Sequence, residues 1–227
     1  MSDMSEQSFA EQAMPGTPAF DEQVQAGVAF LRANPSSREV LRWALVRCSG
    51  GLADLFELED EIRALPIYGT GCPEPFYVLE WLVQAGCMEV FDTDAEGNVV
   101  DADALREQGM SEDEIDDLLV GFAYRTNEVG QAVAQAASPA NRMKRLIAGH
   151  EGSEGAINLA LTFFLDGRTL GEFSSYLKDE IGDEEKTRWG ALSSPMVLVN
   201  KLAETGALAY GNHAWRTTEE GRQLITE

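Results

Sequence analysis

Hydrophobic positions recur in the same order in two segments that lie 120 residues apart. The segments are PFYVLEWLVQAGCMEV over residues 75–90 and PMVLVNKLAETGALAY over residues 195–210. In both, apolar residues are spaced three and four positions apart, which is typical of a helix with one buried face. Proline is favoured in the first turn of a helix, and glycine at its left-handed C-terminal cap. Each segment therefore predicts a helix that ends at a glycine, Gly86 or Gly206, followed by the start of a strand.

Weaker similarities extend the repeat upstream of both segments. GLADL from Gly51 and TLGEF from Thr169 each predict the start of a preceding helix, and Thr169 with Glu172 matches a capping box. Further upstream, ANPSSREVL and ASPANRMKR share a proline and an arginine at an offset of 104 residues. This match predicts that the shared proline opens an equivalent helix in both halves. The polar, glycine-rich residues 149–155 are expected to form a surface loop that absorbs the extra length.

A pair of short strands is expected to close each half. MEVFD and VVDAD flank the polar turn TDAEGN in the first half, and LAYGNHAWRTT contains the tight-turn signal Gly211-Asn212 in the second. Between the halves, Ser111 and Glu114 match a second capping box, and apolar spacing predicts a helix from there to about residue 124.

The predicted fold class is mainly α (α+β), with two similar units related by internal duplication, each with a small β-hairpin. The expected organisation is a flexible N-terminal arm over residues 1–20, a first unit over 21–108, a connecting helix over 109–125 and a second unit over 126–227.

The second half resembles a winged helix-turn-helix domain. The segments TLGEFSSYL, SPMVLVNKLAETGALAY and AWRTTEEGRQL resemble the second helix, third helix and wing of MarR-type bacterial regulators, and residues 40–100 resemble them more faintly. The resemblance implies a three-helix core with a β-hairpin wing, in which the third helix often enters the DNA major groove. The tandem, acidic architecture is also similar to adaptor proteins of the segregation and condensation protein B type, which implies binding to a protein partner.

The charge distribution argues against DNA binding by the first half. The formal net charge is −22, of which residues 1–90 contribute −9, residues 91–118 contribute −10, residues 119–150 contribute +3 and residues 151–227 contribute −6. Such an excess of acids repels phosphate backbones and anionic lipid.

The longest apolar runs are too short to cross a bilayer. Three cysteines without a paired motif and the lack of a secretory leader pattern predict a cytoplasmic protein.

The best candidate for a metal site is the segment DTDAEGNVVDAD, which partly matches a calcium-binding EF-hand loop. Its potential ligands are Asp92, Asp94, Glu96 and Asp103. The final position holds Asp instead of the usual Glu, and a strand is expected to enter the segment. We therefore prefer a polar hairpin turn here and expect no cofactor. The spacing of the histidines, cysteines and glycines matches no catalytic, zinc or nucleotide motif, so we expect no enzyme activity.

Two functional hypotheses follow. The first is a non-catalytic adaptor or regulatory module that binds a protein partner or a second copy of itself. The alternative is a transcriptional regulator that binds DNA through the second half.

Buried packing is expected for Trp43 and Trp81, and for the thiols of Cys48 and Cys87, whereas Cys72 is expected in a loop. The residues proposed to contact DNA or a partner lie in the second half: Lys186, Arg188, Trp189, Ser193, Ser194, Asn200, Lys201 and Arg216.

Overall fold

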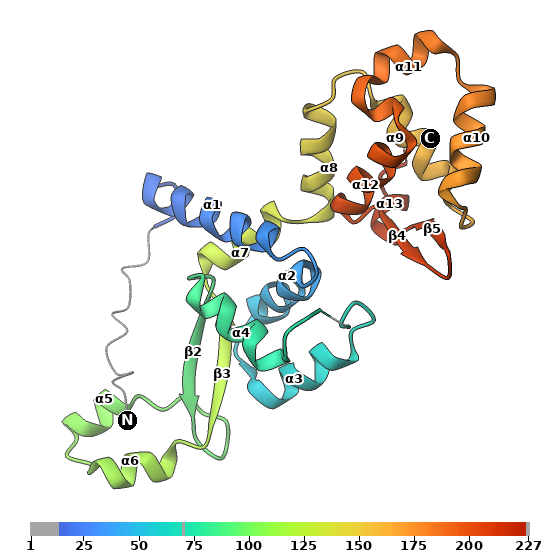
Figure 1. Ribbon diagram of the computed structural model, residues 1–227. Helices are drawn as coiled ribbons and strands as arrows, with labels where there is room; N and C mark the ends of the chain where they lie inside the picture. The colour runs from blue at the N-terminus through green and yellow to red at the C-terminus, as the bar shows by residue number, and fades with distance from the viewer. Residues whose placement is uncertain (1–13, 70, 226–227) are drawn as a thin grey trace. The chain divides into compact units, whose positions relative to one another are not determined.

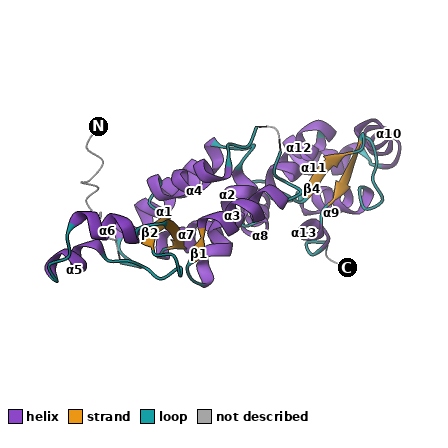
Figure 2. Cartoon of the chain, turned by 90° about the horizontal axis from the view of Figure 1, so that it is seen from below, coloured by secondary structure: helices purple, strands orange, loops and turns teal. Residues whose placement is uncertain are grey.

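The computed structural model describes residues 14–69 and 71–225, and the chain divides into two compact units, one ending at Ala137 and the other beginning at Ser138 (Figure 1). The chain is mainly helical with two small antiparallel sheets, which confirms the predicted α+β class (Figure 2). Among the described residues, no helix is both long enough and apolar enough to pass through a bilayer.

The first unit combines seven described helices with a three-stranded sheet. In chain order its elements are α1 (Pro18–Ala33), α2 (Arg38–Arg47), a 3-10 turn (Cys48–Gly50), β1 (Ala53–Asp54), α3 (Leu55–Ala64), α4 (Pro75–Gln84), β2 (Met88–Thr93), α5 (Ala102–Glu107), α6 (Glu112–Leu118), β3 (Gly121–Thr126) and α7 (Glu128–Ala136). The sheet order is β1-β3-β2, and both pairings are antiparallel. Figure 1 shows α5 and α6 beyond the end of the β2–β3 hairpin, so they form a helical extension at its tip.

Helices α2, α3 and α4 supply most of the core of the first unit. The fully buried side chains include Leu41, Leu45, Leu58, Ile62, Leu79 and Leu82, and Tyr124 covers them from β3. Arg47 and Glu61 join α2 to α3 at the rim, with Nε and Oε2 2.7 Å apart. This hydrogen-bonded pair raises the pKa of Arg47 and lowers the pKa of Glu61.

The second unit contains six described helices and a two-stranded sheet. Its elements are α8 (Pro139–Ala148), α9 (Glu154–Phe163), α10 (Leu170–Glu180), α11 (Asp183–Trp189), a 3-10 turn (Gly190–Ser193), α12 (Pro195–Thr205), β4 (Leu208–Gly211), β5 (Ala214–Thr217) and α13 (Glu219–Arg222). Arg168 forms a single antiparallel bridge to Trp215 on β5, just before α10 begins. The core contains Phe164, Phe173, Leu161, Leu198 and Leu202 without exposed surface.

The end of the last strand is fixed to a core helix by the same kind of contact in both units. The buried hydroxyl of Thr126 donates to the carbonyl oxygen of Leu45 at 2.8 Å, and the buried hydroxyl of Thr217 donates to that of Leu161 at 2.6 Å. Each threonine is followed by a helix whose amino-terminal turn packs against the chain that enters the hairpin.

A glycine makes that close packing feasible in both units. A Cβ atom added to Gly130 would lie 2.0 Å from the carbonyl oxygen of Cys87, and one added to Gly221 would lie 2.2 Å from that of Ala207. Both distances are far below van der Waals contact with backbone atoms, so only glycine fits without a shift of the chain.

The second strand of the first hairpin was wrongly predicted. VVDAD does not form a strand: Val99 makes an isolated bridge to Thr93, the N–H of Val100 donates to the carbonyl oxygen of Asp92, and the side chain of Asp101 caps α5. The partner of β2 is Gly121–Thr126, which lies inside the region expected to be a connecting helix over residues 109–125. The helix that begins after Ser111 ends at Leu118, and the inward side chains of β3 complete the core of the first unit. The boundary between the units therefore falls after residue 137, not at 125.

Two further boundaries differ from the sequence predictions. Of the arm expected over residues 1–20, residues 1–13 lie outside the described residues, and α1 begins at Pro18. Pro35 lies in the turn before α2, whereas Pro139 occupies the first turn of α8. The match at an offset of 104 therefore aligned a turn residue with a helix residue. The contacts of Leu45 and Leu161 instead relate α2 to α9.

Candidate functional site

Helix α4 presents an aromatic surface on the side that faces away from the core. Val78, Leu79 and Leu82 are fully buried, so the opposite side of the helix faces outward. Tyr77 is 55% exposed and Phe76 is 37% exposed, and their rings meet edge to face with centroids 5.6 Å apart. The sequence of α4, PFYVLEWLVQ, contains no lysine or arginine. This helix therefore offers aromatic rings and one carboxylate, but no cation, to a binding partner.

The carboxylate on this helix is held by the sheet. The hydroxyl of Tyr124 on β3 donates to Oε1 of Glu80 at 3.4 Å. Burial, with a contribution from the charge of Glu80, raises the pKa of Tyr124, so the phenol stays protonated and remains a donor at neutral pH. The contact orients Glu80 on α4 beside the aromatic residues.

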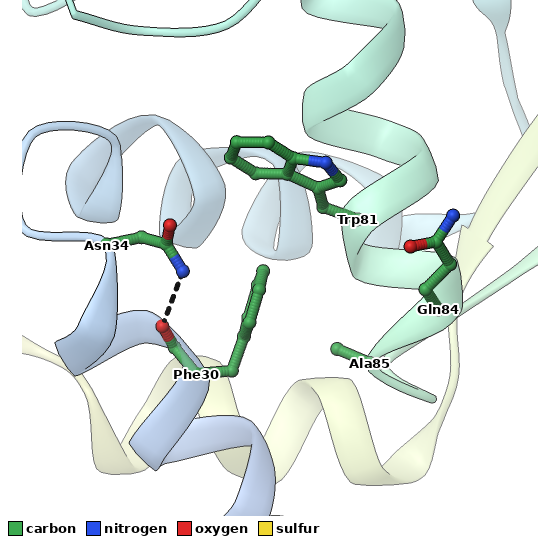
Figure 3. A pocket seen from close by; sticks show the side chains of 5 residues that line it. All are labelled: Phe30, Asn34, Trp81, Gln84 and Ala85. Carbon is green, nitrogen blue, oxygen red and sulfur yellow. Dashed lines mark hydrogen bonds between the residues drawn. The ribbon is translucent and has the colours of Figure 1, made fainter.

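A shallow pocket opens between α1 and α4. It has a volume of about 290 Å³ and is lined by Phe30, Asn34, Trp81, Gln84 and Ala85. Figure 3 shows the ring of Phe30 rising toward the indole of Trp81, with the side-chain amides of Asn34 and Gln84 on opposite sides. Trp81 was expected to serve core packing, but it is only half-buried and forms a wall of this pocket. No motif in the sequence indicates the pocket, because α1 and α4 meet only in the folded chain.

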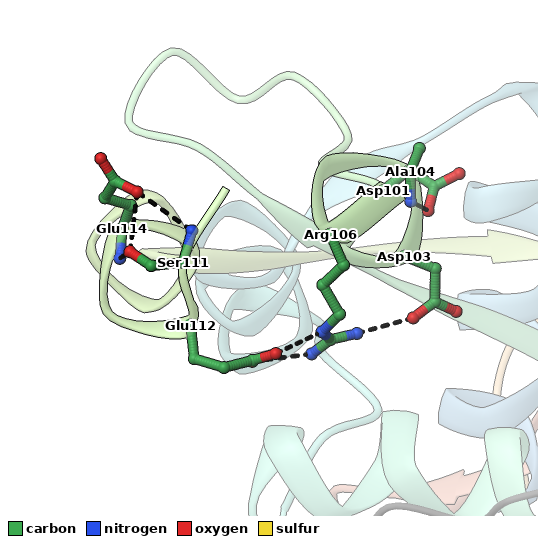
Figure 4. A network of polar contacts seen from close by, with 7 residues as sticks. All are labelled: Asp101, Asp103, Ala104, Arg106, Ser111, Glu112 and Glu114. Carbon is green, nitrogen blue, oxygen red and sulfur yellow. Dashed lines mark hydrogen bonds and ion pairs between the residues drawn. The ribbon is translucent and has the colours of Figure 1, made fainter. Parts of the chain in front are cut away.

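The helical extension of the first hairpin contains many acids, but several of them are bound internally. Arg106 contacts Glu112 through Nε at 2.8 Å and Asp103 through Nη1 at 2.6 Å (Figure 4). Ser111 and Glu114 form the predicted capping box, which is confirmed. These contacts fold α5 against α6 as a compact helical hairpin.

The structure does not bring the proposed calcium ligands together. Oδ1 of Asp94 accepts hydrogen bonds from the backbone N–H groups of Glu96 and Asn98, and Gly97 has a φ of +82°, as in a tight turn. Asp103 is paired with Arg106 instead of pointing toward Asp92. No group of three or more histidine, cysteine, aspartate or glutamate side chains suited to a metal occurs in residues 14–69 and 71–225. The hairpin-turn interpretation accounts for this segment.

The proposed contact residues of the second unit lie on or beside α11, the following 3-10 turn, α12 and β5. Trp189, proposed as a contact residue, is only 4% exposed and belongs to the core, so it is corrected from a surface contact to a packing residue. Arg188 pairs with Glu184 at 3.0 Å, and Lys201 pairs with Glu204 at 2.8 Å.

The other five residues of the set lie on several elements. Ser193 donates to the carbonyl oxygen of Gly190, Ser194 precedes α12, Asn200 is exposed on α12, and Lys186 is half-buried on α11. Arg216 is exposed on β5 and forms no ion pair with any described residue. Two of the four cations of the set, Arg188 and Lys201, are therefore paired with carboxylates of their own helices.

The three cysteines are free thiols in the positions expected of them. Cys48 and Cys87 are buried, and Cys72 lies half-buried in the loop before α4. Burial raises the pKa of both Cys48 and Cys87 to about 11, which keeps them protonated and poorly nucleophilic at neutral pH.

No protein-family model, curated protein or solved structure gives a significant match to this chain.

Proposed function

We propose that the chain consists of two winged-helix-like units related by internal duplication and acts as a non-catalytic protein-interaction adaptor. The order of elements supports the first part. In each unit a core helix is followed by a short bridge to the sheet, a second and a third main helix, a hairpin and a final helix; in the second unit the short α11 lies between the second and third main helices. This is the order of the winged-helix fold, with α4 and α12 as the third helices.

Matched details support the duplication. Pro75 and Pro195 both open the third helix, and the glycines that follow it have φ values of +70° and +84°. The contacts of Thr126 and Thr217, and the crowded positions of Gly130 and Gly221, have the same offset of 91 residues. The larger hairpin of the first unit then corresponds to a wing with a helical extension.

The observation that carries the functional proposal is the outward face of α4. A third helix that binds DNA needs cations for the phosphates and donors for the base edges. Helix α4 instead offers Phe76, Tyr77 and Trp81 around Glu80. Residues 1–137 contain 7 basic against 26 acidic residues. Aromatic residues are enriched at protein interfaces and dominate their energetics, so a protein surface is the partner that fits.

Site-specific photocrosslinking tests this proposal. A benzophenone amino acid placed at Tyr77 in the full chain is expected to form a covalent adduct with one defined protein, or with a second copy of the chain, in cells that make the protein naturally. The matched control is the same group at Gln131, which is exposed on a different helix, α7. Equal adduct yields at the two positions, or no protein adduct at Tyr77, would contradict the proposal.

DNA binding by the second unit is the second candidate. Two features favour it. Residues 138–227 contain 10 basic and 13 acidic residues and are therefore much less acidic than the first unit, and Arg216 is exposed on the hairpin. Fluorescence anisotropy of the full chain with mixed-sequence duplex DNA tests it. Binding that weakens with salt and is lost in Arg216→Glu would favour this function.

A further inference from the structure

We propose that the pocket between α1 and α4 binds the guanidinium group of an arginine side chain on the partner protein. This inference rests on the proposed adaptor function and adds to it the chemistry of the group that is recognised. It is carried by four properties of the pocket: its aromatic walls, its free acceptor, its size and the charge around it.

The walls favour a flat cation. Phe30 from α1 and Trp81 from α4 form the two aromatic sides of the pocket (Figure 3). The face of an aromatic ring attracts a cation, tryptophan most strongly, and a guanidinium can stack on the ring with its whole plane. A lysine ammonium is more strongly hydrated and lacks this stacking surface.

The polar groups of the pocket favour a donor. Nδ2 of Asn34 donates to the carbonyl oxygen of Phe30 at 2.9 Å, which fixes the orientation of the amide. Its Oδ1 is therefore directed away from that bond, and it accepts no hydrogen bond from residues 14–69 and 71–225. Gln84 is exposed on the opposite rim and provides a second amide oxygen. A guanidinium has five N–H donors and no acceptor, which matches amide oxygens on both sides.

The pocket is small and shallow. Pockets for drug-sized molecules have volumes of roughly 300–1,000 Å³ and enclose most of the ligand. At about 290 Å³ and open to solvent, this pocket fits one side chain better than a complete cofactor or metabolite.

The electrostatic environment favours a positive charge. No charged side chain lines the pocket, so a cation there meets no repulsion from within it. Glu80 lies one turn before Gln84 on the same helix, and the first unit has a formal charge of −19. An arginine of the partner would therefore enter a negative field and place its charge against the aromatic walls of the pocket.

Nuclear magnetic resonance of the full chain tests the inference with a defined probe. The four tryptophans give four indole N–H signals, and Trp81→Phe identifies the signal of Trp81. We expect N-acetyl-arginine methylamide to shift that signal with an affinity about tenfold higher than N-acetyl-citrulline methylamide, the neutral analogue of the same shape.

The variant Gln84→Lys places a like charge on the rim at an exposed position, so it is expected to fold normally and to abolish the shift. Gln131→Lys adds the same charge on α7, outside the lining of the pocket, and should leave the affinity within about twofold, since salt screens an exposed charge that does not contact the ligand. Equal affinity for arginine and citrulline, an unmoved Trp81 signal, or equal effects of the two lysine variants would each overturn the inference. If crosslinking at Tyr77 succeeds and the probe fails, only this inference fails. If no protein adduct forms at Tyr77, the adaptor proposal itself fails.

Discussion

Replacing Thr126 or Thr217 by valine removes one buried hydroxyl and changes the side-chain volume little. The hydroxyl of Thr126 donates to the carbonyl oxygen of Leu45, and that of Thr217 to the carbonyl oxygen of Leu161. Both threonines are nearly inaccessible, with 2% and 3% of their surface exposed. Water therefore cannot readily replace the lost donor.

The expected cost follows from that burial. A typical hydrogen bond contributes about 1 kcal/mol net to folding, and a buried group left without its partner costs about 1–3 kcal/mol. We expect each valine substitution to lower the free energy of unfolding of its own unit by about 1–3 kcal/mol, which is a change of about 5- to 150-fold in the unfolding equilibrium. Because the two contacts join the same chemical groups and are buried to nearly the same extent, the two costs should agree within about 1 kcal/mol.

Hydrogen exchange measured by mass spectrometry resolves the effect by segment. Thr126→Val should accelerate exchange in peptides from α2 and β3, and Thr217→Val in peptides from α9 and β5. The control is Thr162→Val, since Thr162 is exposed on α9 and has no such hydrogen bond. A cost below about 0.5 kcal/mol for either buried threonine would refute the argument, because that is the range of ordinary surface substitutions.

Three further results are expected. Gly130→Ala and Gly221→Ala should each lower the free energy of unfolding, measured by thermal unfolding, by about 3 kcal/mol or more, because the added methyl group meets a backbone carbonyl oxygen. The control Gly171→Ala meets only ordinary contacts in α10 and should not destabilise. Alkylation with iodoacetamide at pH 8 should be slow at Cys48 and Cys87, and peptide mapping that finds either modified as fast as in the denatured chain would contradict their burial. The raised pKa of these two thiols should also make the free energy of unfolding fall as the pH rises from about 9 toward 11, because the thiols ionise at lower pH in the unfolded chain than in the folded one. Denaturant titrations that show no decline across that pH interval would count against this prediction.

Local signals allowed several elements to be predicted correctly from the sequence. Helices α4 and α12 begin at Pro75 and Pro195 as expected, and the glycines after them adopt positive φ. The capping box that opens α10 is present as well. Each of these features depends on residues within about one helical turn of each other, so the sequence pattern contains the whole cause.

Long-range pairing was the main source of error. The partner of β2 begins at Gly121, after two inserted helices, while the nearer VVDAD segment has the composition of a strand. The side chain of Asp101 accepts a hydrogen bond from the N–H of Ala104 and thereby starts α5. This local bond competes successfully with strand pairing. The pocket was missed for a related reason, since Phe30 and Trp81 are distant in the sequence and meet only through the packing of α1 and α4.

The central claim is that the third helix of the first unit contacts a protein and not DNA. The most direct measurement compares photocrosslinking at Tyr77 with crosslinking at Val197, which occupies the corresponding position on α12 and is 38% exposed. The adducts are classified by their sensitivity to protease and to nuclease. The account predicts a protease-sensitive, nuclease-resistant adduct at Tyr77, formed in higher yield than any protein adduct at Val197. A nuclease-sensitive adduct at Tyr77, or none there at all, would contradict it.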